Sequence, residues 1–402
     1  MDRVGGHALP VSITQRRHRT GDSEGLDGMA TESVPRTEHR SGGLRVNLVD
    51  PTADPRWAAF VSAHPDGLAF HHPAWLATLA DTFGYPPAHL ACEDDQGRLH
   101  GVLPLVYRRG LIRGRQLWSL PCTAVAGPLT TSAEAAEALI QAAIRLAQEP
   151  PAHRLVLHSM VPDLDPGGTV LSRVEGIPTY VIDLPERTEP LRVGAAGKHS
   201  VIKRGVKKAH EYGLRLREAE RFEDLVAWYR LYVGTMQEKE SPPLPFRLFD
   251  AAWHYLRPEG MLQLLVVDQP RGNGTELIGG EILLLNSQTV LGEYLARSPI
   301  SRQLHGHDLI QWHIVHSSWD AGYRRIDLGD AHPESGLARY KRKWGGQPRP
   351  MYRYVERRPS TTQAGTSGPS RGSKLRQLAK PAWRRMPLPV AARAGALVYR
   401  YA

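Results

Sequence analysis

The chain has 402 residues, of which 41% are hydrophobic and 23% are charged. This length is greater than a domain with a single hydrophobic core usually has, so we expect about two domains. The composition excludes a chain that is disordered throughout, so we expect these domains to be globular. The two cysteines, Cys92 and Cys122, exclude a disulfide scaffold and fit a reducing cytoplasm. No apolar run approaches the ~20 residues of a membrane-spanning helix, and the first residues lack the apolar core of a signal peptide. We therefore expect a cytoplasmic protein.

The formal net charge of +10 is concentrated near the C-terminal end. Residues 357–402 contain ten Lys and Arg residues and no Asp or Glu, which leaves 41 basic residues to balance the 41 acidic residues elsewhere. The net charge therefore does not by itself make the globular part a nucleic-acid binder.

The first half of the chain begins with a polar segment. Residues 1–44 lack hydrophobic periodicity and predict a disordered leader, within which Met29 is an alternative start. An alternating segment at 44–49 opens a first domain, which we place at 45–190. This domain is expected to contain helices at 73–83 and 133–148 and strands at 89–93, 99–107 and 154–158.

The second half repeats this order of elements and predicts a second domain at 191–355. A basic helix at 198–212 ends at Gly213, a residue suited to a helix C-cap. The expected elements that follow are a strand at 214–218, a helix at 222–236, strands at 261–268, 277–285, 288–296 and 325–328, and a helix at 308–321. The repetition predicts an α/β (α+β) fold made of two related halves, each with a mixed sheet flanked by helices.

The C-terminal segment has two parts. Residues 356–373 are rich in Ser, Thr and Gly and predict a linker. Residues 374–402 predict a basic amphipathic tail, in which apolar residues recur at helical spacing from Pro389 onward beside Arg393 and Arg400. Such a helix suits an anionic membrane surface. Docking onto the body of the protein or a partner protein, and contact with RNA, are the alternatives.

Short motifs occur in a fixed order between about residues 45 and 355. They are FHHPAWL at 70–76, GVLPL at 101–105, SLP at 119–121, GPL at 127–129, VKKAHEYGL at 206–214, IDLGD at 326–330 and YKRKWGG at 340–346. Together they resemble the Fem-like branch of the GNAT acyltransferase superfamily, whose members carry two GNAT-type domains and include peptidoglycan-bridge aminoacyltransferases. The resemblance implies two tandem GNAT-like domains and transfer of an acyl or aminoacyl group.

Acyl transfer needs a positive charge for the tetrahedral oxyanion and a base for the nucleophile. The resemblance implies that Lys341 lies at the reacting centre, although residues 340–344 also fit a basic surface strand. Asp327, at the end of a strand, can orient the acceptor or take its proton, or can form a turn. Glu281 and Glu293, on the two arms of a predicted hairpin, are alternative bases.

A second set of residues points to phosphate binding. Lys203 and Lys207, like Arg204 and Lys208, are four residues apart on the basic helix and share a face. They suit a nucleotide, a coenzyme pyrophosphate or an RNA acceptor stem, and a solvated helix face is the alternative. The predicted substrate-binding and phosphate-binding residues are Lys203, Arg204, Lys207, Lys208, Gly306, Tyr294 and Gly329.

Three departures from the family patterns bear on the substrates. The segment 303–308 resembles the [QR]xxGx[GA] loop that holds the pyrophosphate of acyl-CoA, but it ends in Asp308, which opposes a phosphate. Lys203 stands where the family often has arginine, and residues 73–84 lack the basic residue expected for nucleotide- or lipid-linked peptidoglycan precursors. These departures weigh against acyl-CoA as donor and against a peptidoglycan-precursor acceptor.

Two further candidates are assigned to structure. The adjacent His71 and His72 diverge in direction and suit a helix N-terminus better than a metal, so we predict no metal site. Cys122 has no base nearby in the sequence and is expected in the core.

We therefore predict an acyl- or aminoacyltransferase that acts on an amine or hydroxyl of a cell-envelope or secondary-metabolite intermediate. The acceptor is a small molecule or is lipid-linked, the donor is aminoacyl-tRNA or acyl-CoA, and no cofactor is tightly bound. The protein is expected in the cytoplasm, peripheral to the inner face of the membrane. The alternatives are an acyl-CoA-dependent N-acyltransferase and a non-enzymatic GNAT-fold adaptor.

Overall fold

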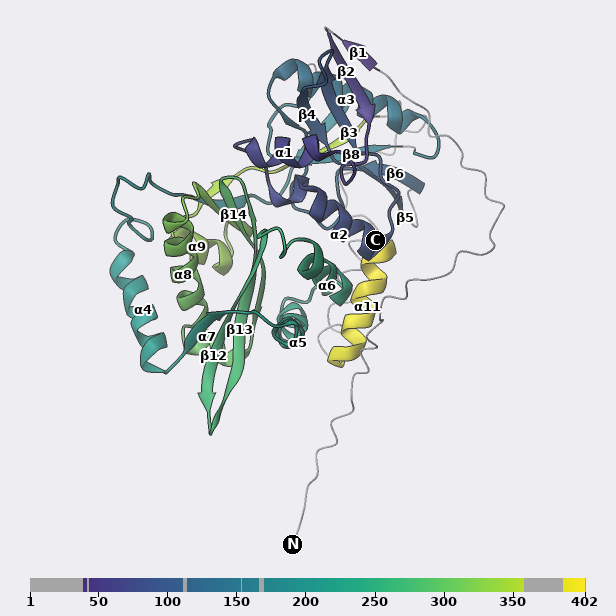
Figure 1. Ribbon diagram of the computed structural model, residues 1–402. Coiled ribbons are helices and arrows are strands. Elements are labelled where there is room, and N and C mark those ends of the chain that lie inside the picture. The colour runs from purple at the N-terminus through teal and green to yellow at the C-terminus, as the bar shows by residue number, and fades with distance from the viewer. Residues whose placement is uncertain are drawn as a thin grey trace. The chain divides into compact units, whose positions relative to one another are not determined.

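A computed structural model describes residues 39–41, 43–110, 114–152, 154–165, 170–357 and 386–401 (Figure 1). Most of the expected leader, including Met29, and most of the expected linker and the start of the tail lie outside the described residues. The described residues all belong to one unit, Thr37–Ala402.

A seven-stranded sheet organises the second half of the chain, in the order β11-β12-β13-β14-β15-β10-β16. Only the β14–β15 pair is parallel. The central strands are apolar on both sides because helices cover both faces of the sheet. The strands are β10 (Thr179–Asp183), β11 (Arg215–Glu218), β12 (Leu262–Arg271), β13 (Gly274–Asn286), β14 (Thr289–Arg297), β15 (Arg325–Asp330) and β16 (Gln347–Arg349).

The helices of the second half divide between the two faces of this sheet (Figure 1). On one face, α4 (His199–Glu211), α8 (Gly306–Asp320) and α9 (Gly336–Lys343) cover a core that includes Ile202, Leu283 and Ile314. On the other face, α5 (Phe222–Glu238) and α6 (Phe246–Tyr255) pack aromatic side chains, among them Trp228 and Phe249, against β13 and β14. The short α7 (Pro299–Gln303) precedes α8.

The first half contains two five-stranded sheets, β1-β2-β3-β4-β7 and β5-β6-β8-β17-β9. Its helices are α1 (Pro55–Ala63), the 3-10 turn η1 (Ala69–His71), α2 (Pro73–Phe83) and α3 (Ala133–Gln148). The strands are β1 (His39–Ser41), β2 (Leu44–Leu48), β3 (Leu90–Asp94), β4 (Leu99–Leu103), β5 (Val106–Gly110), β6 (Gly114–Trp118), β7 (Leu129–Thr130), β8 (Leu155–Ser159), β9 (Leu171–Glu175) and β17 (Tyr352–Glu356).

The two halves share a strand order but exchange a strand. The parallel pair β6–β8 is followed by β17 and β9, just as the parallel pair β14–β15 is followed by β10 and β16. However, β10 lies within the segment predicted as domain 1 and joins the second half, while β17 lies within the segment predicted as domain 2 and joins the first. The boundaries at 190 and 355 stay predictions, and the sheets do not follow them.

The predicted elements agree with the structure in most places. The five expected helices at 73–83, 133–148, 198–212, 222–236 and 308–321 are confirmed within a few residues. Residues 340–343, for which a basic surface strand was the alternative, belong to the helix α9 (Gly336–Lys343). β1 lies within the segment predicted as a leader, and Glu356, the first residue of the predicted linker, belongs to β17. In that strand the Glu356 carboxylate accepts a hydrogen bond from the Leu155 backbone N–H at 3.3 Å.

The C-terminal helix α11 (Leu388–Tyr401) docks onto the body of the protein, one of the predicted alternatives for the tail. The Tyr85 hydroxyl donates to the Tyr399 carbonyl oxygen at 3.1 Å, and Ala391 is fully buried. Gly395 lies so close to Pro243 that a Cβ there would come within 2.3 Å of the Pro243 carbonyl oxygen. Glycine is therefore required at this contact. No helix among the described residues has both the length and the apolar character needed to cross a membrane.

Candidate active site

The parallel strands β14 and β15 separate within the second half. They pair only from Thr289–Arg325 to Leu291–Asp327, and their later residues diverge. A cleft of about 380 Å³ lies at this divergence. Its walls come from β13, β14 and β15, from α8 and α9, from Lys239 at the end of α5, and from residues 122–124 of the first half.

A β-bulge directs Glu293 into this cleft. Ile282 faces Tyr294 and Leu283 faces Gly292, so Glu293 is an extra residue without a partner in the β13–β14 ladder. Glu293 lines the cleft, whereas the next residue, Tyr294, packs its ring against Phe249 in the aromatic core at 5.1 Å between ring centroids. Tyr294 was predicted to bind substrate, but it does not line the cleft.

Lys341 is a buried cation in the wall of the cleft. Its side chain projects from α9, the residue is only 6% exposed, and its Nζ donates to the Asp330 carbonyl oxygen at 2.7 Å. Burial lowers the pKa of Lys341 to about 8, while the charges of Asp330, Asp327 and Glu281 act in the opposite direction. The predicted residue Gly329 also lines the cleft and has a φ of +79°, and a Cβ there would lie 3.6 Å from the Lys341 Nζ.

The half-buried Glu293 has a strongly perturbed carboxyl group. Its pKa is raised to about 8, mainly by burial and also by the charges of Asp327 and Asp330, while Lys341 opposes the change. A carboxyl group and an amine that line the same cleft therefore both change protonation state near pH 8. Such a pair has the properties of a general base and an electrophilic partner working near neutral pH.

Glu281 forms the floor of the cleft and is held by α8. Its Oε2 accepts a hydrogen bond from the Gln311 Nε2 at 2.9 Å and lies 3.3 Å from the His307 Nε2. A Cβ at Gly292 would come within 2.7 Å of the Glu281 Oε1, so a larger residue there would displace this carboxylate. His307 and Gln311 were not predicted, although their spacing of four residues places them on one helix face.

Asp327 lies outside the lining of the cleft. Its Oδ1 accepts hydrogen bonds from the Thr179 hydroxyl and from the Gly329 N–H, the latter at 2.8 Å. Burial raises the pKa of Asp327, whereas these hydrogen bonds lower it. The side chain thus fixes the turn at Gly329, and the exchanged strand β10 supplies the hydroxyl that holds it.

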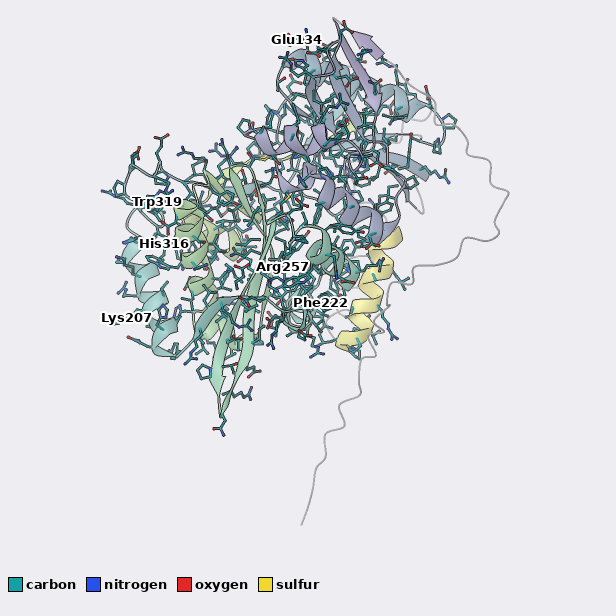
Figure 2. All side chains as sticks on the ribbon, in the orientation of Figure 1. Glu134, Lys207, Phe222, Arg257, His316 and Trp319 are labelled. Carbon is teal, nitrogen blue, oxygen red and sulfur yellow. The ribbon has the colours of Figure 1, made fainter. Side chains whose placement is uncertain are left out.

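The predicted phosphate-binding residues do not line the cleft. Lys203, Arg204, Lys207 and Lys208 are all exposed on the outer side of α4, whose inner side packs on α8 (Figure 2 labels Lys207). The Lys207 Nζ lies 3.7 Å from the Oε1 of Glu211, which is one helical turn further along α4. Gly306 is buried at the start of α8, where a Cβ would come within 2.5 Å of the Ser301 Oγ, so packing accounts for this glycine.

The first turn of α8 does not fit the pyrophosphate of acyl-CoA. The Asp308 Oδ1 accepts hydrogen bonds from the Lys343 Nζ at 2.7 Å and the Tyr340 hydroxyl at 3.1 Å, and its Oδ2 lies 2.9 Å from the His305 Nδ1. A pyrophosphate at this helix N-terminus would meet the Asp308 carboxylate instead of free backbone N–H groups. The Asp308 carboxylate already forms an ion pair with the Lys343 ammonium.

The first half reaches the cleft through residues 122–124, which sequence reasoning did not predict. Cys122 was expected in the core; it packs against the core cluster that contains Trp75 and Leu120, and it also lines the cleft. Leu120 and Cys122 both have positive φ, +51° and +58°, and the segment is anchored by a 3.1 Å hydrogen bond from the Trp75 Nε1 to the Thr123 hydroxyl. Only the folded chain brings this loop to the second half. Within the described ranges, no group of three or more His, Cys, Asp or Glu residues is placed to hold a metal ion.

The second half matches a known family model. Residues 197–342 match the model of the acetyltransferase (GNAT) domain, a range that contains the diverging strands, α8 and Lys341. The second half therefore resembles a GNAT domain over residues 197–342. A search among curated protein sequences found no match to this chain.

Solved structures extend the similarity over both halves. The crystal structure of FemX is 14% identical, covers 77% of this chain and 96% of its own, and has a TM-score of 0.62. L-PGS from Bacillus licheniformis is 12% identical over 84% of this chain and 98% of its own, with a TM-score of 0.52. A conserved protein of unknown function from Bacteroides thetaiotaomicron is 11% identical over 78% of this chain and 99% of its own, with a TM-score of 0.53. The chain thus shares its two-halved fold with FemX and with L-PGS.

Proposed function

We propose that the protein is an acyltransferase that moves an aminoacyl or other acyl group from an ester donor to an amine or hydroxyl in the β14–β15 cleft. The observation that carries this proposal is the presence of Lys341 and Glu293 in one cleft, each with a pKa shifted to about 8. Glu281 and Gly329 support the walls of this cleft, and Asp327 positions Gly329 from outside it.

The two side chains divide the reaction between them. The acceptor nitrogen or oxygen attacks the acyl carbon, forming a bond to it, and the bond from that carbon to the donor oxygen breaks. Glu293 takes the proton from the attacking atom. The Lys341 ammonium stabilises the negative oxygen of the tetrahedral intermediate. The proton then passes to the departing donor oxygen, which balances the reaction.

The donor that we propose is an aminoacyl-tRNA, as the resemblance to Fem-like enzymes implies. The Asp308 carboxylate at the start of α8 disfavours acyl-CoA. The four exposed cations of α4 lie on the same face of the sheet as α8, and an RNA backbone could contact them, Lys207 in exchange for its exposed contact with Glu211. Acyl-CoA remains the donor of the alternative function, an N-acyltransferase.

We also propose that the protein works at an anionic membrane surface in the cytoplasm, where it would meet a lipid-linked acceptor. α11 docks through Ala391 and Gly395, and it exposes Val390 and Leu397, with Arg393 between them on the same face. A helix with an apolar and cationic outer face suits the interface of an anionic leaflet.

A transfer assay tests the catalytic proposal and the donor together. Purified protein is incubated with a panel of radiolabelled aminoacyl-tRNAs or with acetyl-CoA, and with amine acceptors. We expect transfer from the aminoacyl-tRNA arm and none from acetyl-CoA. Lys341→Ala should reduce transfer by about 100-fold to 1,000-fold, the usual effect of losing one oxyanion-stabilising group.

Arg339→Ala is the matched control, because Arg339 is an exposed cation on the same helix and does not line the cleft. Saturable turnover of acetyl-CoA would reject the proposed donor and favour the alternative N-acyltransferase. Unchanged transfer by Lys341→Ala would reject the catalytic role of Lys341. Donor binding without transfer would favour a non-enzymatic adaptor.

A further inference from the structure

Lys239 is a cation of the cleft that the proposed reaction does not use. It follows the last residue of α5, is exposed, and lines the same cleft as Lys341 and Glu293. α5 covers one face of the sheet, and α8 and α9 cover the other. Lys239, at the end of α5, and Lys341, on α9, therefore reach the cleft from opposite faces.

No carboxylate among the described residues lies within ion-pair distance of the Lys239 ammonium. The neighbouring cation Arg297 is paired, with its guanidinium 3.6 Å from the Glu238 carboxylate. Glu281 is hydrogen-bonded to Gln311, and Asp327 to Gly329, so these acids are committed elsewhere. Burial lowers the pKa of Lys239, whereas the charges of Asp330, Glu281 and Glu238 raise it, so these carboxylates act on the ammonium without forming an ion pair with it. The cleft therefore presents an exposed positive charge that no ion pair among the described residues neutralises.

The position of Lys239 in the cleft suits contact with the acceptor rather than with the donor. The proposed donor contacts, on α4, lie on the face of the sheet that α8 and α9 also cover. Lys239 and residues 122–124 line the cleft from the other face, where α5 and the first half pack. Lys239 and Glu293 line the same cleft, so an acceptor that fills the cleft meets both side chains.

We infer that the acceptor carries an anionic group, a carboxylate or a phosphate, next to its reacting amine or hydroxyl, and that Lys239 binds this group. This inference rests on the proposed function, since it assigns the substrate class of the same cleft. Lys239 is thus a specificity-determining residue: its ammonium pairs with the anion while Glu293 receives the proton of the nucleophile.

Paired probes separate the two sources of the anion. β-Alanine is compared with its neutral amide, and phosphoethanolamine with ethanolamine, by calorimetric titration of the full-length protein. We expect at least one anionic member to bind about tenfold more tightly than its neutral partner, as one charge-assisted contact provides. Lys239→Gln should abolish this preference and Lys239→Arg should retain it. Arg230→Gln, which removes an exposed cation from the same helix outside the cleft, should not change it.

Equal binding of charged and neutral members, or absence of saturable binding by the anionic members, would overturn the inference. A preference that survives in Lys239→Gln would also overturn it. The titration requires no donor, so its outcome is independent of turnover. Anion preference without transfer would contradict the proposed function alone, whereas transfer without anion preference would contradict only the inference.

Discussion

The two halves of the molecule contain the same pair of diverging parallel strands but differ in what lies between these strands. In each half a parallel pair of strands separates after a few residues, β6 from β8 and β14 from β15. In the first half the chain itself occupies this place: the Ser119 Oγ accepts the His158 N–H at 2.8 Å, and a Cβ at Gly127 would come within 2.7 Å of the Ser159 Oγ. In the second half the same place is a cleft lined by ionisable groups. A repeated fold therefore supplies the divergence, and the local side chains decide whether it is filled or reactive.

The ends of the corresponding helices differ in the same way. α3 begins at Ser132, whose hydroxyl accepts the Ala135 N–H as an ordinary N-cap. α8 carries Asp308 in its first turn, paired with Lys343 and His305. α3 also carries an acid, Glu134, in its first turn, so the two helix starts differ in the partners of the acid: Asp308 forms an ion pair with Lys343 of α9.

The sharpest test of this comparison is Glu293→Gln, because the first half has no counterpart to this bulged carboxylate. The substitution keeps the size of the side chain and removes the base, so we expect transfer to fall by about 100-fold to 10,000-fold. The variant is measured in the transfer assay with the donor and acceptor that support activity. Full activity would reject Glu293 as the base.

The pH dependence of the wild-type transfer rate tests the roles of Glu293 and Lys341 together. Glu293 must lose its proton to act, so the rate should rise as the pH passes about 8, its raised pKa. Lys341 must keep its proton, so the rate should fall as the pH rises above about 8, its lowered pKa. We expect a narrow bell centred near pH 8, and Glu293→Gln should lose the rising limb. A flat profile between pH 6 and about 9 would contradict both assignments.

The sequence predicted the elements of the fold better than the contents of the cleft. Helical periodicity and turn residues were enough to find α3, α4, α5 and α8, because these are long and amphipathic. The exchange of β10 and β17 was not predictable, since strand pairing depends on contacts between residues far apart in the sequence.

Contacts between residues far apart in the sequence also decide which of the predicted site residues line the cleft. Lys341, Glu281, Glu293 and Gly329 line it, and the first of these came from a motif. Lys239 and Cys122 are distant in sequence and belong to no pattern. Tyr294 differs from Glu293 by one position, and the bulge decides which of the two faces the cleft. A bulge leaves no mark in the hydrophobic pattern.

In the first half, the residues that fill the space beside β6 and β8 should contribute to stability rather than to activity. Gly127→Ala puts a methyl group against Ser159 and should lower the free energy of unfolding by about 1–3 kcal/mol, the usual cost of overpacking. Gly234→Ala is the matched control, because a Cβ there meets no atom within 4 Å and Gly234 lies inside α5. Chemical denaturation measures both variants. The activity per folded molecule should be unchanged in Gly127→Ala, and a selective loss of activity at full stability would mean that the first half also holds a working site.

The smallest expected effect concerns α11, which touches both halves through Tyr85 and Pro243. Its outer residues Val390 and Leu397 are 50% and 59% exposed, so replacing both with glutamate should leave the unfolding free energy almost unchanged. If this face meets an anionic bilayer, the double variant should bind phosphatidylglycerol vesicles about tenfold more weakly in a flotation assay, because it loses apolar contact and gains two negative charges. Neutral phosphatidylcholine vesicles serve as the control and should bind the wild-type protein weakly. Equal flotation of wild type and variant with anionic vesicles would show that the docked helix serves only to join the two halves.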